Sequence, residues 1–334
     1  MADIGRAVAL GVIYVVMARA GLALDAVHGF AAAVWPLTGI ALAALVLYGT
    51  CLWPGIAVGA FLVNWSSEEK IMLNATGASA AERLSVGDVE LEVIRRGIGR
   101  PLLLLHGMQH IDPRARFVEL LSGHAELLAP SHPGFGHSAR PTDFDTVYDL
   151  VHLYLDVLEA LPYERVTLVG LSFGGWLAAE IAVKCCHRVD RLVLVDALGI
   201  KISERDTPDI LDVFNTSPQE VQRRSWHDPG KWAPDFNAMS DDELVVRARN
   251  WEALCLYGWH PYMYNPQLKR WLRRITRPTL VLWGASDGIV QPCYGRAYSA
   301  SIPGARFELI AEAGHHHELE QPEAFVDRVV AFLQ

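Results

Sequence analysis

Residues 170–174 read Gly170-Leu171-Ser172-Phe173-Gly174, which is a Gly-x-Ser-x-Gly pattern. The apolar run at residues 166–169 is typical of a short buried strand, and residues 177–183 are typical of a helix. A serine on a tight strand-to-helix turn is held in strained backbone geometry, and flanking glycines avoid collisions with the strand and the helix. The pattern therefore predicts a nucleophile elbow that exposes the Ser172 hydroxyl. An ordinary glycine-rich turn with an exposed serine would match the same residues, so motifs elsewhere in the chain are needed to distinguish the two interpretations.

Two backbone N–H groups are candidates for an oxyanion hole. The Phe173 N–H comes at the start of the predicted helix, where free donors and the helix dipole favour negative charge. The apolar residues 101–105 predict a central strand buried on both faces, and His106-Gly107 follows it directly. Serine hydrolases of the α/β class place their second oxyanion donor at this point, which is the Met108 N–H here. We expect His106 to hydrogen-bond within this loop rather than to act as a catalytic base.

Strand and helix patterns alternate along the chain, as a parallel sheet requires. Alternating apolar positions on both sides of Gly87-Asp88 predict a hairpin within residues 82–96. Further strands are predicted at residues 101–105, from about 127, and at 166–169, 191–196, 279–284 and 306–310. Helices are predicted at residues 145–161, 177–183 and 322–333. These elements predict an α/β fold with a mostly parallel central sheet.

Three side chains suited to nucleophilic catalysis follow predicted strands. Ser172 lies in the elbow, Asp287 follows a later strand, and His315 follows the last strand. The order Ser, Asp, His is that of α/β hydrolases, so we expect Ser172 as nucleophile, His315 as base and Asp287 as orienting acid. Asp196 also ends a predicted strand and is the alternative acid.

A metal site is the alternative explanation for the consecutive histidines His315, His316 and His317. Adjacent side chains on a loop point apart, however, and no cysteine or carboxylate set with tetrahedral-site spacing accompanies them. The five cysteines are an odd number without a Cys-x-x-Cys pair, which favours buried free thiols over a disulfide framework or a zinc site. They are Cys51, Cys185, Cys186, Cys255 and Cys293. We predict no metal and no cofactor.

Residues 198–274 change to a helical pattern between two predicted sheet strands. We expect them to fold as a helical lid above the strand ends, where Ser172 is exposed. The segment is rich in tryptophan and tyrosine, whose rings would either line an apolar acyl or aryl pocket or pack the lid onto the body. The candidates for substrate contact are Trp176, behind the elbow, and Trp251, Trp259 and Tyr262 in the expected lid.

The N-terminal part of the chain is strongly apolar. Residues 4–24 are almost continuously apolar, and about 20 such residues span a bilayer. Two further apolar runs follow at residues 30–52 and 54–63. A secretory signal peptide is the alternative for the first run, but Arg19 and the lack of a clear cleavage site count against it. We expect N-terminal transmembrane helices, and the polar, mixed residues 66–81 are expected to form a linker.

Two tryptophan-proline pairs mark the N-terminal segment, Trp35-Pro36 within residues 34–45 and Trp53-Pro54 within residues 52–64. These stretches resemble the opening helices of the MASE1 family, an integral membrane sensory module of bacterial signalling proteins. The resemblance covers residues 1 to about 65, a fraction of that family's multi-helix domain, and implies a location in the bacterial inner membrane. Such a truncated module would be either a membrane anchor or a relic of gene fusion.

Residues 82–334 as a whole resemble the α/β-hydrolase superfamily. The motifs that carry the resemblance are Leu105-His106-Gly107, residues 133–138, the elbow with Gly175, residues 283–287, and Ala313-Gly314-His315 with Glu320-Gln321-Pro322. The resemblance implies the α/β-hydrolase fold and the same three catalytic residues. Serine at the elbow speaks against the haloalkane dehalogenase and epoxide hydrolase branches, which use aspartate there.

The net charge is −9 and no block rich in lysine or arginine occurs, which argues against nucleic acid as a partner. We expect a serine hydrolase that cleaves a carboxylic ester or related acyl compound through an acyl-enzyme, with a small apolar acyl or aryl molecule as substrate. A C–C bond hydrolase of the meta-cleavage-product type would use the same triad. A membrane-tethered receptor that binds a small molecule without turnover is the non-enzymatic alternative.

Overall fold

The computed structural model describes residues 82–204 and 206–334. The predicted membrane segment (residues 1–65) and the predicted linker (66–81) lie outside the described residues. The chain divides into two units, and the second, Ala81–Gln334, contains every element discussed below. Among the described residues, no helix is both long and apolar enough to cross a membrane.

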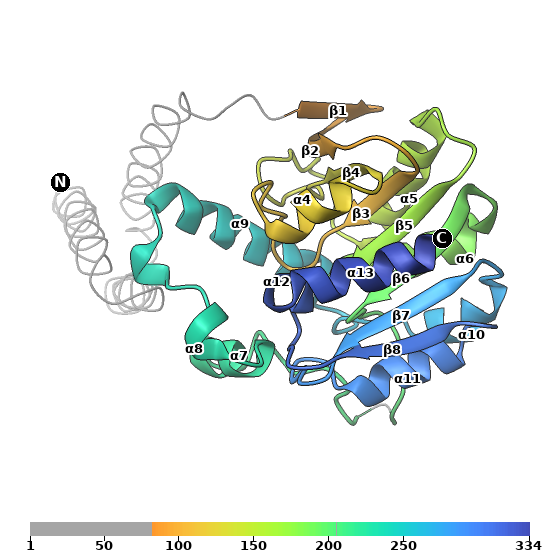
Figure 1. Ribbon diagram of the computed structural model, residues 1–334. Helices are drawn as coiled ribbons and strands as arrows, with labels where there is room; N and C mark the ends of the chain where they lie inside the picture. The colour runs from red at the N-terminus through yellow and green to blue at the C-terminus, as the bar shows by residue number, and fades with distance from the viewer. Residues whose placement is uncertain (1–81, 205) are drawn as a thin grey trace, which may run out of the picture. The chain divides into compact units, whose positions relative to one another are not determined.

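Within these residues, an eight-stranded sheet forms the centre of the unit (Figure 1). Its strands are β1 (Glu82–Val86), β2 (Val89–Arg96), β3 (Pro101–Leu105), β4 (Glu126–Pro130), β5 (Val166–Leu171), β6 (Val189–Val195), β7 (Thr279–Gly284) and β8 (Arg306–Ile310). Their spatial order is β1-β2-β4-β3-β5-β6-β7-β8. β2 is antiparallel to both β1 and β4, and the remaining neighbours are parallel. The predicted hairpin and the predicted mostly parallel sheet are confirmed.

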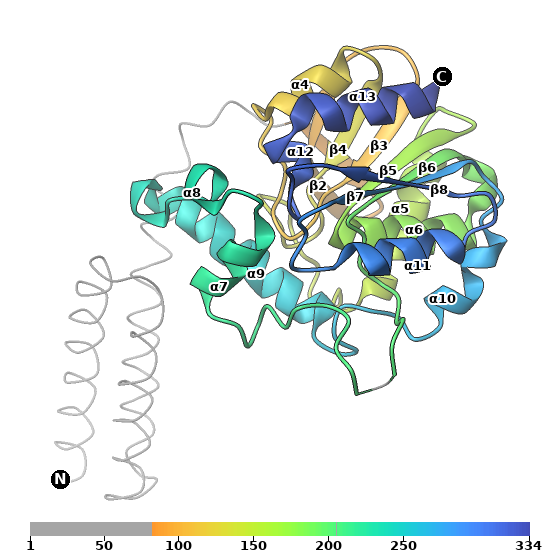
Figure 2. The ribbon, with the colours of Figure 1, turned by 60° about the horizontal axis from the view of Figure 1, so that its bottom comes forward.

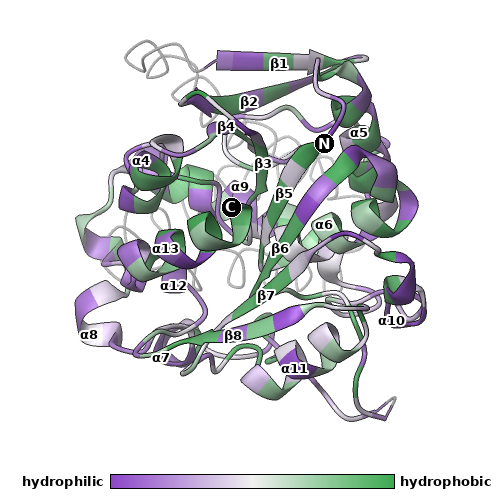
Figure 3. Ribbon diagram, turned by 45° about the vertical axis from the view of Figure 1, so that its right-hand side comes forward, coloured by the Kyte–Doolittle hydropathy of each residue, from purple (hydrophilic) through white to green (hydrophobic). Residues whose placement is uncertain are grey.

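Helices cover both faces of the sheet (Figure 2). One face carries α4 (Arg116–Ser122) and α13 (Pro322–Leu333), and the other carries α5 (Val147–Ala160), α6 (Phe173–Lys184) and α11 (Pro292–Ala300). Successive strand residues point to opposite faces, so Leu102 and Leu104 pack with α4 and α13, whereas Leu103 and Leu105 pack with α5 and α6. The apolar run of β3, green in Figure 3, therefore serves two hydrophobic cores.

Two of these helices, α4 and α11, have no counterpart in the sequence predictions. α4 is short, and Ala115 at its N-cap makes no side-chain cap hydrogen bond. α11 carries Gly295, where a Cβ would lie 2.4 Å from Cε3 of Trp283 on β7. Glycine weakens the helical signal in the sequence, yet the close approach of α11 to β7 requires it.

Residues 198–274, called the inserted segment below, connect β6 to β7. Their α-helices are α7 (Pro218–Ser225), α8 (Pro229–Trp232), α9 (Asp241–Gly258) and α10 (Leu268–Trp271). α9 begins with a capping box in which Ser240 and Glu243 each accept the other's backbone N–H. An isolated bridge joins Ile210 to Val290, in the loop that follows β7. The predicted helices lie within residues 218–274, the described residues 198–217 contain no helix, and a lid function stays a prediction.

Candidate active site

Ser172 occupies a strained turn between β5 and α6, with φ of 49° and ψ of −110°. Its N–H donates to Val195 O at 2.7 Å, and its carbonyl accepts from Leu198 N at 3.1 Å, so the end of β6 and the loop after it hold the turn from both sides. The turn leaves no room for side chains beside it, because a Cβ on Gly174 would lie 2.2 Å from the carbonyl oxygen of Leu105. Glycine at this position is therefore required by the close approach of α6 to the end of β3.

Ser172, His315 and Asp287 form a continuous hydrogen-bonded row. Oγ of Ser172 lies 2.8 Å from Nε2 of His315, and Nδ1 of His315 lies 2.8 Å from Oδ2 of Asp287. The three residues follow β5, β8 and β7, whose parallel arrangement brings the loops at their carboxyl ends together. All three are buried. The arrangement can transfer a proton from the serine hydroxyl to the imidazole while the carboxylate fixes the ring.

Asp287 is itself held in place by the loop that carries it. Its Oδ1 accepts from Ile289 N at 2.8 Å and from Val290 N at 2.9 Å, which leaves Oδ2 for His315. Burial by itself lowers the pKa of His315, but the charge of Asp287 and its hydrogen bond outweigh burial and raise this pKa to about 9. Glu318 contributes a smaller increase, and Asp196 acts in the same direction whenever it is ionised. The site thus stabilises the imidazolium that forms when His315 accepts a proton.

The two expected oxyanion donors flank the serine. Gly107 lies directly against it, because a Cβ on Gly107 would be 3.1 Å from Cβ of Ser172. Met108 follows Gly107, and Phe173 is the first residue of α6. Within the described part of the chain, the N–H groups of Met108 and Phe173 donate no hydrogen bond. Free donors beside a nucleophile are suited to receive an oxyanion.

His106 shapes this loop rather than joining the triad. Its Nε2 accepts from His132 N at 2.9 Å, and its Nδ1 lies 2.8 Å from Gly107 O, which assigns the ring proton to Nδ1. The rings of His106 and His132 stack with centroids 3.8 Å apart. Burial, reinforced by His132, lowers the pKa of His106 well below its usual value, so the ring is neutral and structural.

Asp196, the alternative acid, lies beside the triad without replacing Asp287. One ligand atom each from Asp196, Asp287 and His315 lies within 4.8 Å of the others. These three are also the described residues that could jointly hold a metal ion. Asp287 already contacts Nδ1 of His315, so this grouping overlaps the triad.

The other two consecutive histidines point elsewhere. The His316 ring lies 4.6 Å from the Trp226 ring, and its Nδ1 is 3.7 Å from Oε1 of Glu318. His317 begins α12 (His317–Glu320) and is fully buried, with Nε2 at 3.0 Å from Oδ2 of Asp196. The contact joins α12 to the loop after β6, so His317 has a long-range neighbour that no local pattern in the sequence indicates.

The four aromatic residues that are candidates for substrate contact each pack against other side chains or the backbone, and their contact with a substrate stays a prediction. Trp176 is buried against Gly199, where a Cβ would lie 2.4 Å from Cδ1 of the indole. Trp251 and Trp259 lie 5.4 and 5.5 Å from the ring of Phe214, and Trp259 remains 63% exposed. Phe214, which the sequence analysis did not single out, is thus the centre of an aromatic cluster in the inserted segment.

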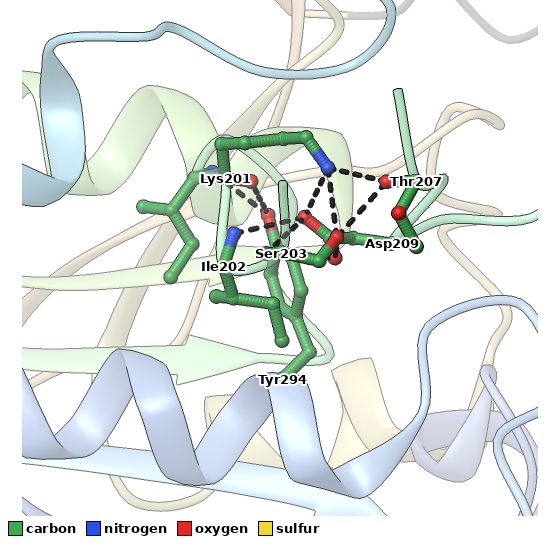
Figure 4. Close-up of polar contacts among 7 residues, drawn as sticks. Lys201, Ile202, Ser203, Thr207, Asp209 and Tyr294 are labelled. Atoms are coloured by element: carbon green, nitrogen blue, oxygen red, sulfur yellow. Dashed lines mark hydrogen bonds and ion pairs between the residues drawn. The ribbon is translucent and has the colours of Figure 1, made fainter. Parts of the chain in front are cut away.

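Tyr262 completes the Phe214 cluster and also lines a separate hollow. Its hydroxyl donates to Leu211 O at 2.6 Å and accepts from Val213 N at 2.8 Å. The hollow has a volume of about 820 Å³ and does not include a triad residue. Two charged residues that line the hollow form an ion pair, in which Nζ of Lys201 lies 2.9 Å from Oδ2 of Asp209 (Figure 4). Because its two hydrogen bonds are to Leu211 and Val213, the hydroxyl of Tyr262 is bound to the backbone of its own segment.

A buried carboxylate joins the inserted segment to the catalytic loops. Oε1 of Glu320 accepts from His227 N at 2.8 Å, and its Oε2 accepts from Gly314 N, next to the triad histidine. His315 N in turn donates to Ser225 O at 2.7 Å. Glu320 was visible in the sequence as part of a family-like motif, but its contact with residue 227 is long-range and has no local signal.

The fold and the site define an α/β hydrolase. A family model described as "Alpha/beta hydrolase family" matches residues 102–328, and the chain belongs to that family. A model of the MASE1 family matches residues 6–81. Both resemblances are confirmed, and the MASE1 match includes the residues 66–81 expected to be a linker.

Several characterised proteins are similar to this chain. A 2-hydroxy-6-oxo-2,4-heptadienoate hydrolase of Pseudomonas putida is 28% identical over 272 residues, covering 77% of this chain and 97% of that protein. A 2-hydroxymuconate semialdehyde hydrolase of Pseudomonas sp. (strain CF600) is 28% identical over 256 residues, covering 71% and 88%. The crystal structure of a meta-cleavage product hydrolase variant (CumD) superposes with a TM-score of 0.62 at 23% identity, covering 76% and 97%. That last likeness shows the fold alone.

Proposed function

We propose that the protein is a serine hydrolase in which Ser172 attacks a carbonyl carbon. The observation that carries this proposal is the row of two 2.8 Å contacts from Ser172 to His315 and from His315 to Asp287. His315 removes the proton of Ser172, and Asp287 holds the ring and stabilises the imidazolium. The Met108 and Phe173 N–H groups bind the oxyanion. Losing one such donor typically costs about 3 kcal/mol of transition-state stabilisation.

We propose a carboxylic ester or related acyl compound as the first substrate class. Attack forms an acyl-enzyme at Ser172, His315 returns its proton to the leaving alcohol, and water then releases the acid. The test is turnover of p-nitrophenyl butyrate by wild type and Ser172→Ala, combined with labelling by a fluorophosphonate probe. Loss of both signals in Ser172→Ala is expected. A variant that keeps them would remove Ser172 from the mechanism, and a folded wild type that shows neither would favour the receptor alternative.

A second candidate reaction is C–C bond hydrolysis, and the names of the 28% identical relatives favour it. On 2-hydroxy-6-oxo-2,4-heptadienoate, water would add across the C5–C6 bond. The C6 acyl carbon would leave as acetate through Ser172, and C5 would take a proton to give 2-hydroxypenta-2,4-dienoate. Product analysis separates the two classes. Acetate and the dienoate would appear in equal amounts from the diketone if the chain is a C–C hydrolase, and neither would form if it cleaves esters alone.

The inserted segment and the N-terminal match suggest where the reaction takes place. We propose that residues 198–274 cover the serine as a lid, because Glu320 joins His227 of that segment to Gly314 beside the triad histidine. The MASE1 match at residues 6–81 supports a membrane location, and we propose the bacterial inner membrane. Activity-based labelling of membrane and soluble fractions tests this location, since the labelled full-length chain should sediment with membranes.

A further inference from the structure

A second buried carboxyl group lies next to the triad. Asp196 follows β6 with a positive φ of 44°, and its side chain is inside the protein with a relative exposure of 1%. Its Oδ1 accepts from Gly284 N at 2.9 Å. Its Oδ2 has no hydrogen bond among the described residues. A non-glycine residue at positive φ with a buried, unpartnered carboxyl oxygen is costly, and such strain is common where a residue has a function.

The carboxyl group of Asp196 faces a second imidazole. Nε2 of His317 is 3.0 Å from Oδ2 of Asp196, but the two are not aligned for a hydrogen bond, so both are buried polar atoms without a partner. The site therefore contains two carboxyl and imidazole pairs side by side, Asp287 with His315 and Asp196 with His317. Asp196, Asp287 and His315 offer ligand atoms that lie within 4.8 Å of one another.

Two carboxylates this close and this buried repel each other, and one of them is expected to keep its proton. Burial raises the pKa of Asp196 well above its usual value, and the charge of Asp287 raises it further. Glu318 on α12 acts in the same direction, whereas His315 and the Gly284 N–H oppose it. Burial also lowers the pKa of His317. Asp287, with two backbone N–H donors and His315, is thus the better placed of the two to carry the negative charge.

We propose that Asp196 is a second orienting acid for His315, which stays neutral while Asp287 is charged and takes over the orientation of the imidazole when Asp287 is removed. It is a positioning residue, because it acts on the reaction through His315. This inference rests on the proposed serine hydrolase function.

The geometry allows the exchange of roles. Among the described residues, His315 makes its side-chain hydrogen bonds to Ser172 and Asp287, and the ligand atoms of Asp196 and His315 lie within 4.8 Å, a span that one bridging water fits with two ordinary hydrogen bonds. In Asp287→Ala, the space of the missing carboxylate would admit that water. Removal of the neighbouring charge also lets Asp196 ionise, so a carboxylate again faces the imidazolium.

A double-mutant cycle tests the proposal on the full-length chain. The readout is the rate constant for fluorophosphonate labelling of Ser172 in wild type, Asp196→Asn, Asp287→Ala and the double variant, which needs no known substrate. We expect Asp196→Asn alone to change the rate by less than about threefold, and Asp287→Ala to lower it by about 10- to 100-fold. In the Asp287→Ala background, Asp196→Asn should cost at least about a further tenfold. Equal factors in both backgrounds would overturn the proposal.

The pH profile gives a second readout that a merely structural role would not move. A carboxylate near an imidazolium stabilises it. When neither Asp287 nor Asp196 is present, His315 should therefore lose its proton at lower pH. In the Asp287→Ala background, Asp196→Asn should therefore move the acid limb of the labelling rate down by about one pH unit. An acid limb that stays in place contradicts the proposal, as does a folded Asp287→Ala protein that labels no faster than His315→Gln.

Asp209 supplies the matched control. Its side chain is 6% exposed and accepts from Lys201 Nζ and from Ile202 N at 2.8 Å, and its partners do not include a triad residue (Figure 4). Asp209→Asn should change the labelling rate by the same factor in both backgrounds.

Thermal unfolding checks each variant, and Asp196→Ser replaces Asp196→Asn in the cycle if the latter does not fold. Labelling that persists in Ser172→Ala would refute the hydrolase function itself, whereas Ser172-dependent labelling with an additive cycle refutes this inference alone.

Discussion

The carboxyl edge of the sheet and the inserted segment meet at residues 225–228, and they are held in different ways. At the sheet edge, Ser172, Asp287 and His315 each follow a parallel strand whose register is fixed by backbone hydrogen bonds to its neighbours. The inserted segment has helices, caps and an aromatic cluster around Phe214, and separate contacts tie it to other elements, such as the backbone hydrogen bonds from Leu211 N to Ile289 O and from His315 N to Ser225 O. The edge is thus held by continuous strand pairing, whereas the segment is held by separate contacts. Substitutions in the two regions should therefore differ in their effects on activity and on stability.

The largest difference should separate two adjacent histidines. His315→Gln keeps a polar side chain but removes the base, and the loss in kcat should be about 10⁶-fold. His316→Gln changes the next residue, whose ring contacts Trp226 of the inserted segment, and activity should fall by less than about tenfold. Steady-state turnover of an ester substrate measures both. Comparable losses in the two variants would mean that the base has been assigned to the wrong residue.

A methyl group added at the elbow should be far more damaging than one added in the inserted segment. Gly174→Ala places a Cβ 2.2 Å from Leu105 O and should lower the free energy of unfolding by about 3 kcal/mol. Gly230→Ala, in α8, meets its nearest atom, Oδ1 of Asp228, at an ordinary 3.5 Å, and should be neutral or stabilising by up to about 1 kcal/mol. Urea unfolding of both variants checks the difference, and equal stabilities would contradict the tight packing of the elbow.

The pH dependence should report the charge of the triad. Because the pKa of His315 is raised to about 9, kcat/KM should increase as the pH rises toward about 9, where the base becomes neutral. The sign for stability is the opposite. The charged ring stabilises the fold fully below the usual histidine pKa of about 6.5, and this contribution is lost as the pH rises through about 9. An acid limb of kcat/KM at or below pH 6.5 would show that the site does not stabilise the imidazolium.

The contact between the two regions should give an intermediate effect. Glu320→Gln keeps one acceptor oxygen for the His227 N–H but turns an amide toward Gly314 N, which then loses its acceptor. We expect a loss of about 2 kcal/mol in the free energy of unfolding, because the lost hydrogen bond has a charged acceptor and is buried. A decrease of about tenfold in kcat/KM should accompany it, since Gly314 positions His315. Unchanged kinetics would separate this carboxylate from catalysis.

The sequence predicts the sheet edge well because its signals are local. Three signals are each contained in a short stretch of sequence: the elbow, the apolar run of β3 and the strand before Asp287. The α/β-hydrolase fold could therefore be inferred from them. The pairing of Asp196 with His317 and the contact of Glu320 with residue 227 join residues far apart in the chain, and no local pattern records them. Roles for the aromatic residues could not be assigned either, because the same ring suits a pocket wall and a packing contact.

The smallest effects should lie within the aromatic cluster, where they separate packing from substrate contact. Tyr262→Phe removes hydrogen bonds to Leu211 O and from Val213 N and should cost about 1 to 2 kcal/mol of stability. Trp259→Ala should cost less than about 0.5 kcal/mol, because 63% of the side chain is already exposed. Both variants should keep kcat/KM within about threefold if these rings only pack the segment. A much larger loss of kcat/KM in Trp259→Ala, without loss of stability, would instead place this exposed ring against the substrate and show that the segment closes over the serine during turnover.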